Sequence, residues 1–448
     1  MPEPSPDPVL CVDFGSTFTK AALVDGRTGR LLGSASHRTT LETDVLDGLD
    51  VCRDRLAAEH PDADTAEVLA CSSAGGGLRI AVVGNEGLVT AEAGRRVALS
   101  SGGRVVAVVS RDDSGDFAEL AAETRPDVVL LSGGTDGGDT AGILAGAERL
   151  AGWDGPVVVA GNVVARDDVL ALLGERPVVV ADNVVPRIGV LAPESARRAI
   201  REMFLAHVIG GKHLSARTDF AAMVRGATPD LVLTGVEVLA AEVGDVVVVD
   251  IGGATTDVHS VVRLDPEDAG LSREVVATTP VTRTVEGDLG MRWSALSTWE
   301  AGHEAGLLGE DTRAAAVRRS AEPDLLPGSD SERREDEALA SAATTLALRR
   351  HVGRSRVVLG PDGRVVERSG KDLREVDLLV GSGGTLRHSD PTVTHRILSG
   401  LLGPSAEGWQ LPERPAVVVD RAYVLAALGL LAESRPAAAA GLARSLSP

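Results

Sequence analysis

Short apolar runs alternate with amphipathic stretches along most of the chain, and this alternation predicts its elements. In the N-terminal part, the expected strands span residues 9–13, 19–24, 30–36 and 67–72, with a helix at 44–59. A later block repeats this order, with strands at 246–250, 256–263 and 274–281 and a helix near 286–299. Strands that alternate with helices are typical of α/β folds with parallel sheets.

The stretch between these blocks has a strand–helix rhythm of its own. Its expected strands are 78–83, 105–110, 127–132 and 157–161, and its expected helices are 86–101, 115–124, 138–151 and 166–173. This order resembles a complete doubly wound, flavodoxin-like domain inserted into the first block.

These patterns also give the expected domain boundaries. The first half is expected at 9–77 and 178–244, the insertion at 78–177, and the second half at 245–432. The second half includes a helical and hairpin insertion at 300–374, whose hairpin at 356–370 turns at Pro-Asp-Gly. The Pro-rich residues 1–8 are expected to be disordered, and the Ala-rich tail 433–448 to be weakly ordered.

Composition narrows the class of protein. A chain of 448 residues is long for a single core, and its 2% of aromatic residues leaves Val, Leu, Ala and Ile to build the cores. A formal net charge of −20 argues against binding to nucleic acid or to an anionic membrane, since phosphates would be repelled. The three cysteines lack metal-ligand spacing, and no apolar run approaches the roughly 18 residues of a membrane helix. With no signal-peptide pattern at the start, a cytoplasmic location is expected.

The stretch "VDFGSTFTK" carries the first candidate chemistry. A buried strand ends at Asp13, and Gly15, Ser16 and Thr17 form a tight turn into the next strand. Small residues let backbone N–H groups approach a phosphate, while Lys20 supplies a point charge. Asp13 is a candidate ligand of Mg²⁺, through water. A plain β-hairpin whose turn needs glycine would show the same pattern.

The stretch "VVVVDIGGATTDV" repeats this device at residues 246–258. Its candidate phosphate-binding and metal-binding residues are Asp250, Gly252, Gly253, Thr255, Thr256 and Asp257. Two such hairpins could hold one polyphosphate from opposite sides. In a third stretch, "VDLLVGSGGTLRH", an apolar strand leads into Gly381, Ser382, Gly383 and Gly384, against which an adenosine could lie. Each pattern is weak alone, but the three in this order favour a nucleotide site.

At this point the chain resembles the superfamily of actin, sugar kinases and heat-shock-chaperone ATPases. The first two stretches look like its phosphate-1 and phosphate-2 hairpins, and the third like its adenosine motif. The resemblance implies a duplicated fold, two RNase H-like halves with the nucleotide in the cleft between them. Residues 182–200 resemble the first connecting helix and 417–432 the second.

The finer resemblance is to the glutamate (methylaspartate) mutase accessory proteins, called MutL-type but unrelated to the mismatch-repair protein. "DFGSTFTK", "LLSGGTDGG", "VVVAGN", "DVVVVDIGGATTDVHS" and "LLVGSGGTLRH" carry it. It implies an ATPase, using ATP and Mg²⁺, that reactivates an adenosylcobalamin-dependent mutase by exchanging damaged cobalamin for intact cofactor. The mutase subunits would be its partners, and a homo-oligomer is possible.

Roles for the candidate residues follow from the chemistry of phosphoryl transfer. Asp13 and Asp250 would organise Mg²⁺ and the attacking water, while Lys20 neutralises developing charge. Thr17, Thr255 and backbone amides would hold the terminal phosphates. Asp257 is either a further carboxylate on the metal side or only a strand cap.

Other functions fit the same fold. A small-molecule kinase would need a carboxylate base aimed at a substrate hydroxyl, and no distinctive loop supplies one. The activator of a 2-hydroxyacyl-CoA dehydratase would need exposed cysteines for an iron–sulfur cluster, but Cys11 and Cys71 lie in expected strands and Cys52 in an expected helix. A cytoskeletal filament protein remains possible from the fold alone.

The insertion allows two interpretations. Its glycine-rich loop at 131–138 lacks the Gly-Lys-Ser/Thr ending of a Walker A motif, which favours a structural turn or partner-facing loop over a second nucleotide site. The strand–helix order suits a cobalamin-binding domain, yet residues 61–206 contain no histidine to ligate cobalt. The insertion would then copy the shape of the mutase's cobalamin subunit, or it would be an ordinary doubly wound domain.

Overall fold

A computed structural model describes residues 7–264, 278–360 and 363–447, which divide into two compact units. Unit 1 comprises residues 1–238, 275–279 and 424–443, and unit 2 comprises 239–274, 280–423 and 444–448. The chain passes from unit 1 to unit 2 within α9 (Thr228–Val243) and returns between β17 (Ala416–Val419) and α16 (Val424–Ala432). Each unit has its own hydrophobic core.

The first sheet of unit 1 has the strand order β10-β4-β1-β2-β3. Its strands are β1 (Pro8–Phe14), β2 (Phe18–Asp25), β3 (Leu31–Arg38), β4 (Glu67–Ser72) and β10 (Val224–Ala227). β1, β2 and β3 form an antiparallel meander, while β4 runs parallel to both β1 and β10. Val9, Leu10 and Val12 of β1 have no exposed surface, as expected for a strand covered on both faces.

The sheet of unit 2 repeats this topology, with the order β13-β12-β11-β16-β17. The further strands are β11 (Val246–Ile251), β12 (Thr256–Val261), β13 (Val281–Glu286) and β16 (Leu378–Ser382). β11, β12 and β13 form the antiparallel meander, and β16 runs parallel to both β11 and β17. The predicted duplicated α/β fold is therefore confirmed, since each unit repeats the same order and the same strand directions.

A second sheet in unit 1 is formed by the insertion. Its strands are β5 (Leu78–Val83), β6 (Gly103–Val109), β7 (Val128–Leu131), β8 (Val157–Val159) and β9 (Val178–Val180). All are parallel, in the order β6-β5-β7-β8-β9, which is the 2-1-3-4-5 order of flavodoxin-like sheets. β9 was not predicted, and it pairs with β8 directly after the boundary that the sequence placed at residue 177. The run of three valines is too short to stand out as a strand.

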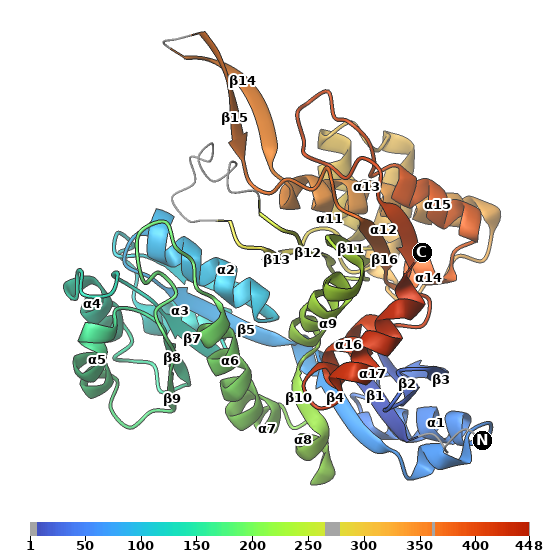
Figure 1. The fold of residues 1–448 in the computed structure, drawn as a ribbon, viewed down its shortest axis with the longest axis horizontal. Coiled ribbons are helices and arrows are strands. Elements are labelled where there is room, and N and C mark those ends of the chain that lie inside the picture. The colour runs from blue at the N-terminus through green and yellow to red at the C-terminus, as the bar shows by residue number, and fades with distance from the viewer. Residues whose placement is uncertain (1–6, 265–277, 361–362, 448) are drawn as a thin grey trace. The chain divides into compact units, whose positions relative to one another are not determined.

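Helices flank these sheets (Figure 1). In unit 1 they include α1 (Val45–Ala57), α2 (Glu92–Ser100), α3 (Phe117–Thr124), α4 (Ala141–Arg149), α5 (Arg166–Leu173), α6 (Glu194–Met203), α7 (Ile209–Gly211), α8 (Asp219–Met223) and α17 (Pro436–Ala443). In unit 2 they include α11 (Ala295–Glu304), α12 (Arg313–Ala321), α13 (Asp330–His351), α14 (Gly384–His388) and α15 (Pro391–Ser399). The predicted hairpin at 356–370 is β14 (Arg354–Gly360) with β15 (Gly363–Ser369), an arm that projects from unit 2 in Figure 1. None of the helices in the described part is long and apolar enough to cross a membrane.

Three predictions about helices are wrong. Residues 182–193 are not helical, because Pro186 and Pro193 interrupt them, and α6 starts only at Glu194. The segment predicted as the second connecting helix, 417–432, is helical only from Val424, because residues 417–419 belong to β17. The long helix that leads into the second half, α9, was not predicted. The helix predicted near 286–299 begins at Ala295, because 287–294 forms a loop against the turn after β11. Half of the strand predicted at 274–281, residues 274–277, lies outside the described residues, and β13 begins only at the last predicted residue, Val281.

The Ala-rich tail is ordered, contrary to prediction. α17 buries Ala438, Ala439 and Leu442. Its small side chains allow a close approach to the β2–β3 turn, where a Cβ on Gly441 would lie 2.0 Å from the carbonyl oxygen of Thr28. Gly441 thus lets this helix pack against the turn where a larger side chain would not fit.

Candidate functional site

The first hairpin, β1 and β2, ends in a tight turn at Gly15, Ser16 and Thr17. The Gly15 N–H donates to the carbonyl oxygen of Phe18 (3.1 Å). A Cβ on Gly15 would lie 2.6 Å from that oxygen, so the turn requires glycine. Thr39 braces the turn, because its hydroxyl donates to the Gly15 carbonyl (2.7 Å). Ser16 and Thr17 are exposed, so their hydroxyls are available to a ligand.

Asp13 lies at the end of β1, and only 8% of the residue is exposed. Lys20, directly opposite it on β2, places its Nζ 3.3 Å from Asp13 Oδ2. The hydroxyl of Thr228, the first residue of α9, donates to Asp13 Oδ1 (2.6 Å). Asp13 and Lys20 thus form an ion pair that the sequence pattern did not predict, with a threonine from a distant part of the chain as a third member.

Cys71 lies on the other side of Asp13, in β4, with its Sγ 3.7 Å from Asp13 Oδ1. Burial, together with the nearby Asp13 carboxylate, raises the pKa of the Cys71 thiol well above its ordinary value. All three cysteines are buried, and burial raises the pKa of Cys11 to about 12 and that of Cys52 to about 11. Buried thiols of this kind are unsuited to an exposed iron–sulfur cluster, which weighs against the dehydratase-activator alternative.

The second hairpin, β11 and β12, has a turn at residues 252–255. The Gly252 N–H donates to the carbonyl oxygen of Thr255 (2.8 Å), which repeats the bond in the first turn. A loop at 287–294 covers this turn, because the backbone N–H groups of Met291 and Arg292 donate to the carbonyls of Gly252 (3.0 Å) and Gly253 (2.7 Å). The second turn is thus held from outside as well as by its own strands.

Asp250 is half-buried at the end of β11, with Asp257 directly opposite it on β12. Two carboxylates in this position repel each other, and Arg283 of β13 compensates. The Arg283 Nη2 lies 2.6 Å from Asp257 Oδ2, and the two side chains are only 4% and 14% exposed. Asp257 is thus the carboxylate of a buried ion pair through Oδ2, whereas its buried Oδ1 has no hydrogen-bond partner among the described residues, so its role as a metal-side carboxylate stays a prediction.

Thr256 does not face the turn either. The residue is completely buried, and its hydroxyl donates to the carbonyl oxygen of Leu289 (2.9 Å). This bond fixes the 287–294 loop instead of leaving the hydroxyl for a phosphate. Thr255, which precedes it in the turn, is half-buried and stays a candidate for phosphate binding.

The third motif lies beside the second hairpin, since Ser382 of β16 is the parallel neighbour of Asp250. A Cβ on Gly383, which has a φ of 100°, would lie 2.2 Å from the Ile251 carbonyl oxygen and 2.9 Å from Asp250 Oδ1. Gly381 is buried against Leu398 and Leu386, so the core requires it. Of the four predicted residues only Gly384 is exposed, which leaves it as the candidate surface for an adenosine.

The donors present are compatible with Mg²⁺. Magnesium keeps several waters and takes one or two carboxylates plus substrate phosphates, so it does not need a dedicated cluster of protein ligands. Among the described residues no group of three or more His, Cys, Asp or Glu side chains forms such a cluster. Asp13 and Asp250 each end a strand beside a glycine turn, where one carboxylate can meet a phosphate-bound ion.

Sequence analysis missed Thr228, Thr39 and Arg283. Thr228 follows a short strand and opens a helix just before a proline, which is a common helix-start signal, but nothing local links it to Asp13. Arg283 was missed because the third strand was placed too early in the chain.

The glycine-rich loop of the insertion is held by side-chain amides. Asn162 Nδ2 donates to the carbonyls of Gly138 and Asp139 (both 3.2 Å), and Asn183 Nδ2 donates to that of Gly134 (3.0 Å). Gly134 and Gly137 have positive φ, which a turn of this shape requires. These bonds favour the structural-turn interpretation of this loop.

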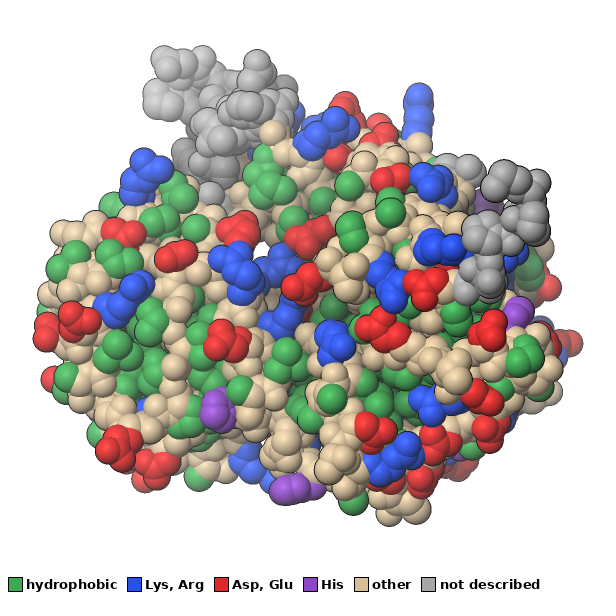
Figure 2. Space-filling model, turned by 60° about the horizontal axis from the view of Figure 1, so that its bottom comes forward, with side chains coloured by type: hydrophobic (Ala, Val, Ile, Leu, Met, Phe, Trp, Pro, Cys, Tyr) green, Lys and Arg blue, Asp and Glu red, His purple; other side chains and the backbone are tan. Residues whose placement is uncertain are grey.

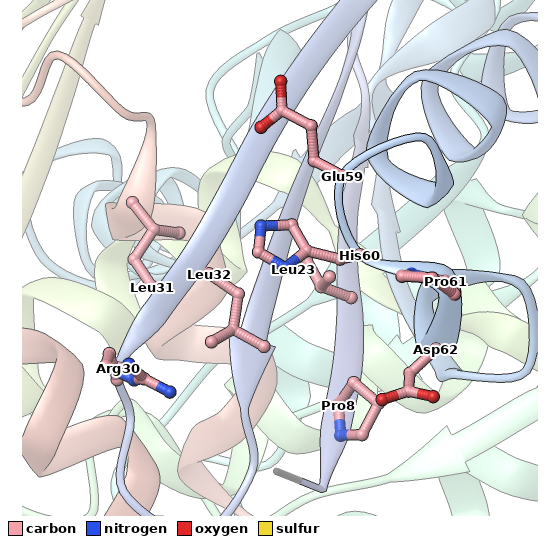
Figure 3. Close-up of a pocket in the computed structure, with 9 residues that line it drawn as sticks. All are labelled: Pro8, Leu23, Arg30, Leu31, Leu32, Glu59, His60, Pro61 and Asp62. Atoms are coloured by element: carbon pink, nitrogen blue, oxygen red, sulfur yellow. The ribbon is translucent and has the colours of Figure 1, made fainter.

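A shallow pocket in unit 1 lies away from the first turn. Its volume is about 250 Å³, and Figure 3 shows its lining of Pro8, Leu23, Arg30, Leu31, Leu32, Glu59, His60, Pro61 and Asp62. Pro8 and Leu23 belong to the end of the first hairpin opposite Asp13. The pocket is thus separate from the candidate site. On the face drawn in Figure 2, acidic and basic side chains lie among one another, so a partner there meets both signs of charge.

Comparison with known proteins places the chain in one family. Residues 9–446 match the MutL protein family. "Protein MutL" of Clostridium tetanomorphum is 36% identical over 449 residues, which cover 96% of this chain and 97% of that protein.

Solved structures are similar only at low identity. Acetone carboxylase in its nucleotide-free form is 15% identical, with a TM-score of 0.41 over 96% of this chain and 70% of that chain. The activator of 2-hydroxyisocaproyl-CoA dehydratase from Clostridium difficile, solved with ADPNP, is 10% identical, with a TM-score of 0.32 over 96% and 95%. These likenesses carry no inference about activity, whereas the family match and the close relative both span nearly the whole sequence. The chain belongs to the MutL protein family.

Proposed function

We propose that the protein is a slow, Mg²⁺-dependent ATPase that reactivates an adenosylcobalamin-dependent mutase. The observation that carries the ATPase part is the duplicated hairpin. In both units a buried strand ends in an aspartate, a glycine turn follows, and the same backbone bond closes the turn. Phosphoryl transfer needs mainly positioning and charge stabilisation, which such turns supply.

In this proposal each residue has a definite task. Ser16, Thr17 and the backbone N–H groups of the two turns bind phosphate oxygens, and Gly384 offers bare backbone to the adenosine. Lys20 neutralises charge that develops on the terminal phosphate, while Thr228 and Lys20 together hold Asp13 in place. Asp13 and Asp250 orient the attacking water. Mg²⁺, when bound, neutralises charge on the phosphates.

Phosphate release from ATP tests the ATPase assignment. Asp13→Asn and Asp250→Asn should each reduce turnover at least about 100-fold without a change in melting temperature. Asp47→Asn, on the exposed face of α1, is the matched control and should keep the parental rate. Turnover at the parental rate in both site variants would show that the site has been assigned wrongly.

The mutase part of the proposal rests on membership of the MutL family. The cognate mutase, blocked with cyanocobalamin, should regain activity when this protein, ATP and adenosylcobalamin are added together. ADP in place of ATP should give no recovery. Rapid phosphorylation of a sugar, with no recovery of the mutase, would favour the kinase alternative.

The insertion is proposed to dock on the mutase in place of its cobalamin subunit. Its 2-1-3-4-5 strand order and its lack of histidine support this role. Val164, 65% exposed just after β8, lies at the carboxyl edge of the insertion's sheet. Val164→Glu should therefore weaken binding of the mutase's large subunit and leave ATP hydrolysis unchanged. Undiminished affinity in this variant would argue against docking at that edge.

A further inference from the structure

Two large apolar side chains are exposed close to the second turn. Trp293, in the loop that covers the turn, is 67% exposed, and Leu326, in the loop between α12 and α13, is 78% exposed. Aromatic residues make up only 2% of this chain, so an indole left in solvent is conspicuous. Trp is also among the residues most enriched at the energetic centres of protein interfaces.

Hydrogen bonds of the neighbouring residues connect the segments that carry Trp293 and Leu326 to the second turn. The residues on either side of Trp293 bond to the turn directly. The Arg292 N–H donates to the Gly253 carbonyl (2.7 Å), and the Ser294 hydroxyl donates to the Ala254 carbonyl (2.6 Å). The Nε of Arg292 also donates to the carbonyl of Leu325 (2.9 Å), next to Leu326. Trp293 therefore lies between two residues that are bonded to the turn, and Leu326 follows a residue that is bonded to Arg292.

A buried ion-pair network holds the Arg292 side chain in place. Its Nη2 lies 3.0 Å from Asp336 Oδ2 on α13, and Arg319, which is 1% exposed, pairs with the same carboxylate. Because this ion-pair network is buried, a shift of the turn moves the loop as a body more readily than it breaks these contacts.

The charge around Leu326 defines the kind of partner. Residues 322–332 contain four acidic side chains and no basic one, and two of the four are paired with arginines outside this segment, Asp330 with Arg333 and Glu332 with Arg318. Glu322 and Asp324, just before the two leucines, are exposed. A complementary surface would offer an apolar pocket surrounded by Lys and Arg.

We propose that Trp293 and Leu326 form a docking surface for a protein partner that has an apolar pocket surrounded by Lys and Arg. The position of this docking surface would depend on whether the second turn has nucleotide bound. Nucleotide bound at the turn would change the affinity for the partner through Arg292 and Ser294. The inference rests on the proposed function, because it takes the second turn to bind phosphate and the partner to be the mutase.

The test measures the affinity of the full-length protein for the purified cognate mutase, with a non-hydrolysable ATP analogue and with ADP. Trp293→Ser and Leu326→Ser should each weaken binding by about 30-fold in one nucleotide state, as expected for a central interface residue. Val357→Ser, a matched control at the same 67% exposure on β14, should change the affinity less than twofold. ATP turnover without the mutase should be parental in all three variants.

A second measurement tests the coupling without the partner. Tryptophan fluorescence of the wild type should differ between the ATP-analogue and ADP states, and Trp293→Phe should abolish the difference. If ATP binds but substitution of Trp293 changes neither the fluorescence difference nor the mutase affinity, the inference fails and the ATPase proposal stands. A raised KM for ATP in Trp293→Ser would place this residue in the nucleotide site and overturn the docking surface. Loss of self-association in that variant would identify a second copy as the occupant and overturn the inference too.

Discussion

The two hairpins share a frame but differ in charge. In the first, Asp13 has Lys20 opposite it on one side and Cys71 on the other; in the second, Asp250 has Asp257 and Ser382 in the same positions. The first carboxylate is thus compensated directly across the hairpin. The second faces another carboxylate, whose charge Arg283 compensates from the next strand.

This difference suggests different tasks for the two copies. In the function that we propose, the compensated first copy, with Lys20 a quarter exposed, would bring positive charge to the terminal phosphate. The second copy carries excess negative charge near its turn, which suits a cation, and its turn is bonded to the 287–294 loop. Duplication has kept the backbone geometry and changed the side chains that determine the chemistry.

The largest expected effect comes from breaking the Asp257–Arg283 pair. Asp257→Ala leaves a buried guanidinium without its carboxylate, which should destabilise unit 2 by about 3–5 kcal/mol. Denaturant unfolding should show the loss, whereas turnover per folded molecule should fall less than for Asp250→Asn. Equal stability with abolished turnover would instead return Asp257 to the metal site.

The position equivalent to Asp257 in the first hairpin should behave in the opposite way. Lys20→Met should reduce ATP turnover by about 100-fold, because one charge on the transition state is lost. Its effect on the free energy of unfolding should be smaller than that of Asp257→Ala, since Thr228 still donates to the Asp13 carboxylate that Lys20 leaves. Lys20→Arg is the control and should restore part of the rate. A strongly destabilised Lys20→Met would show that this pair is structural.

The second unit should also be more sensitive to acid. His351 is buried between Ser260 (2.8 Å) and Thr284 (3.0 Å), and burial, with Lys371 and His259 nearby, holds its pKa well below 6.5. The unfolded chain therefore binds a proton at His351 that the folded chain does not bind. Stability should be complete above about pH 6.5 and fall by up to about 1.4 kcal/mol per pH unit below it. His351→Gln should flatten this dependence in urea unfolding at several pH values; an unchanged slope would argue against His351 as its source.

The smallest expected effect concerns Thr228. Thr228→Val keeps the shape of the side chain but removes the donor to Asp13 Oδ1, which should lower turnover by about tenfold. Thr228→Ser should keep most of the rate. Parental turnover in the valine variant would show that Lys20 alone is enough to position Asp13.

The sequence predicted the frame of both hairpins well. Strands such as 67–72 and 246–250 were placed to within a residue, because buried valine and leucine runs bounded by glycine turns leave little choice. The carboxylates at the strand ends followed from the same pattern. The later helix was predicted to start too early. Residues 287–294 include Gly287 and Gly290, which favour a loop, and their backbone bonds to a turn far away in the sequence.

The side chains that tune the site were harder to predict. Thr228 reaches Asp13 across 215 residues, and Arg283 reaches Asp257 from a third strand whose position had to be known first. The position of Thr256 was equally hard to predict, because its hydroxyl donates to the Leu289 carbonyl in a distant loop. Such contacts depend on which strands become neighbours, and local spacing does not contain that information.

The central claim is that Asp13 and Asp250 both serve the ATP hydrolysis that we propose. A double-mutant cycle in steady-state ATP hydrolysis tests it most directly, with Asp13→Asn, Asp250→Asn and the double variant measured beside the wild type. Residues that act as a unit on one nucleotide are strongly non-additive. We therefore expect each single change to cost at least about 100-fold and the double variant to be little slower than the slower single one. A parental rate in either single variant would contradict the claim.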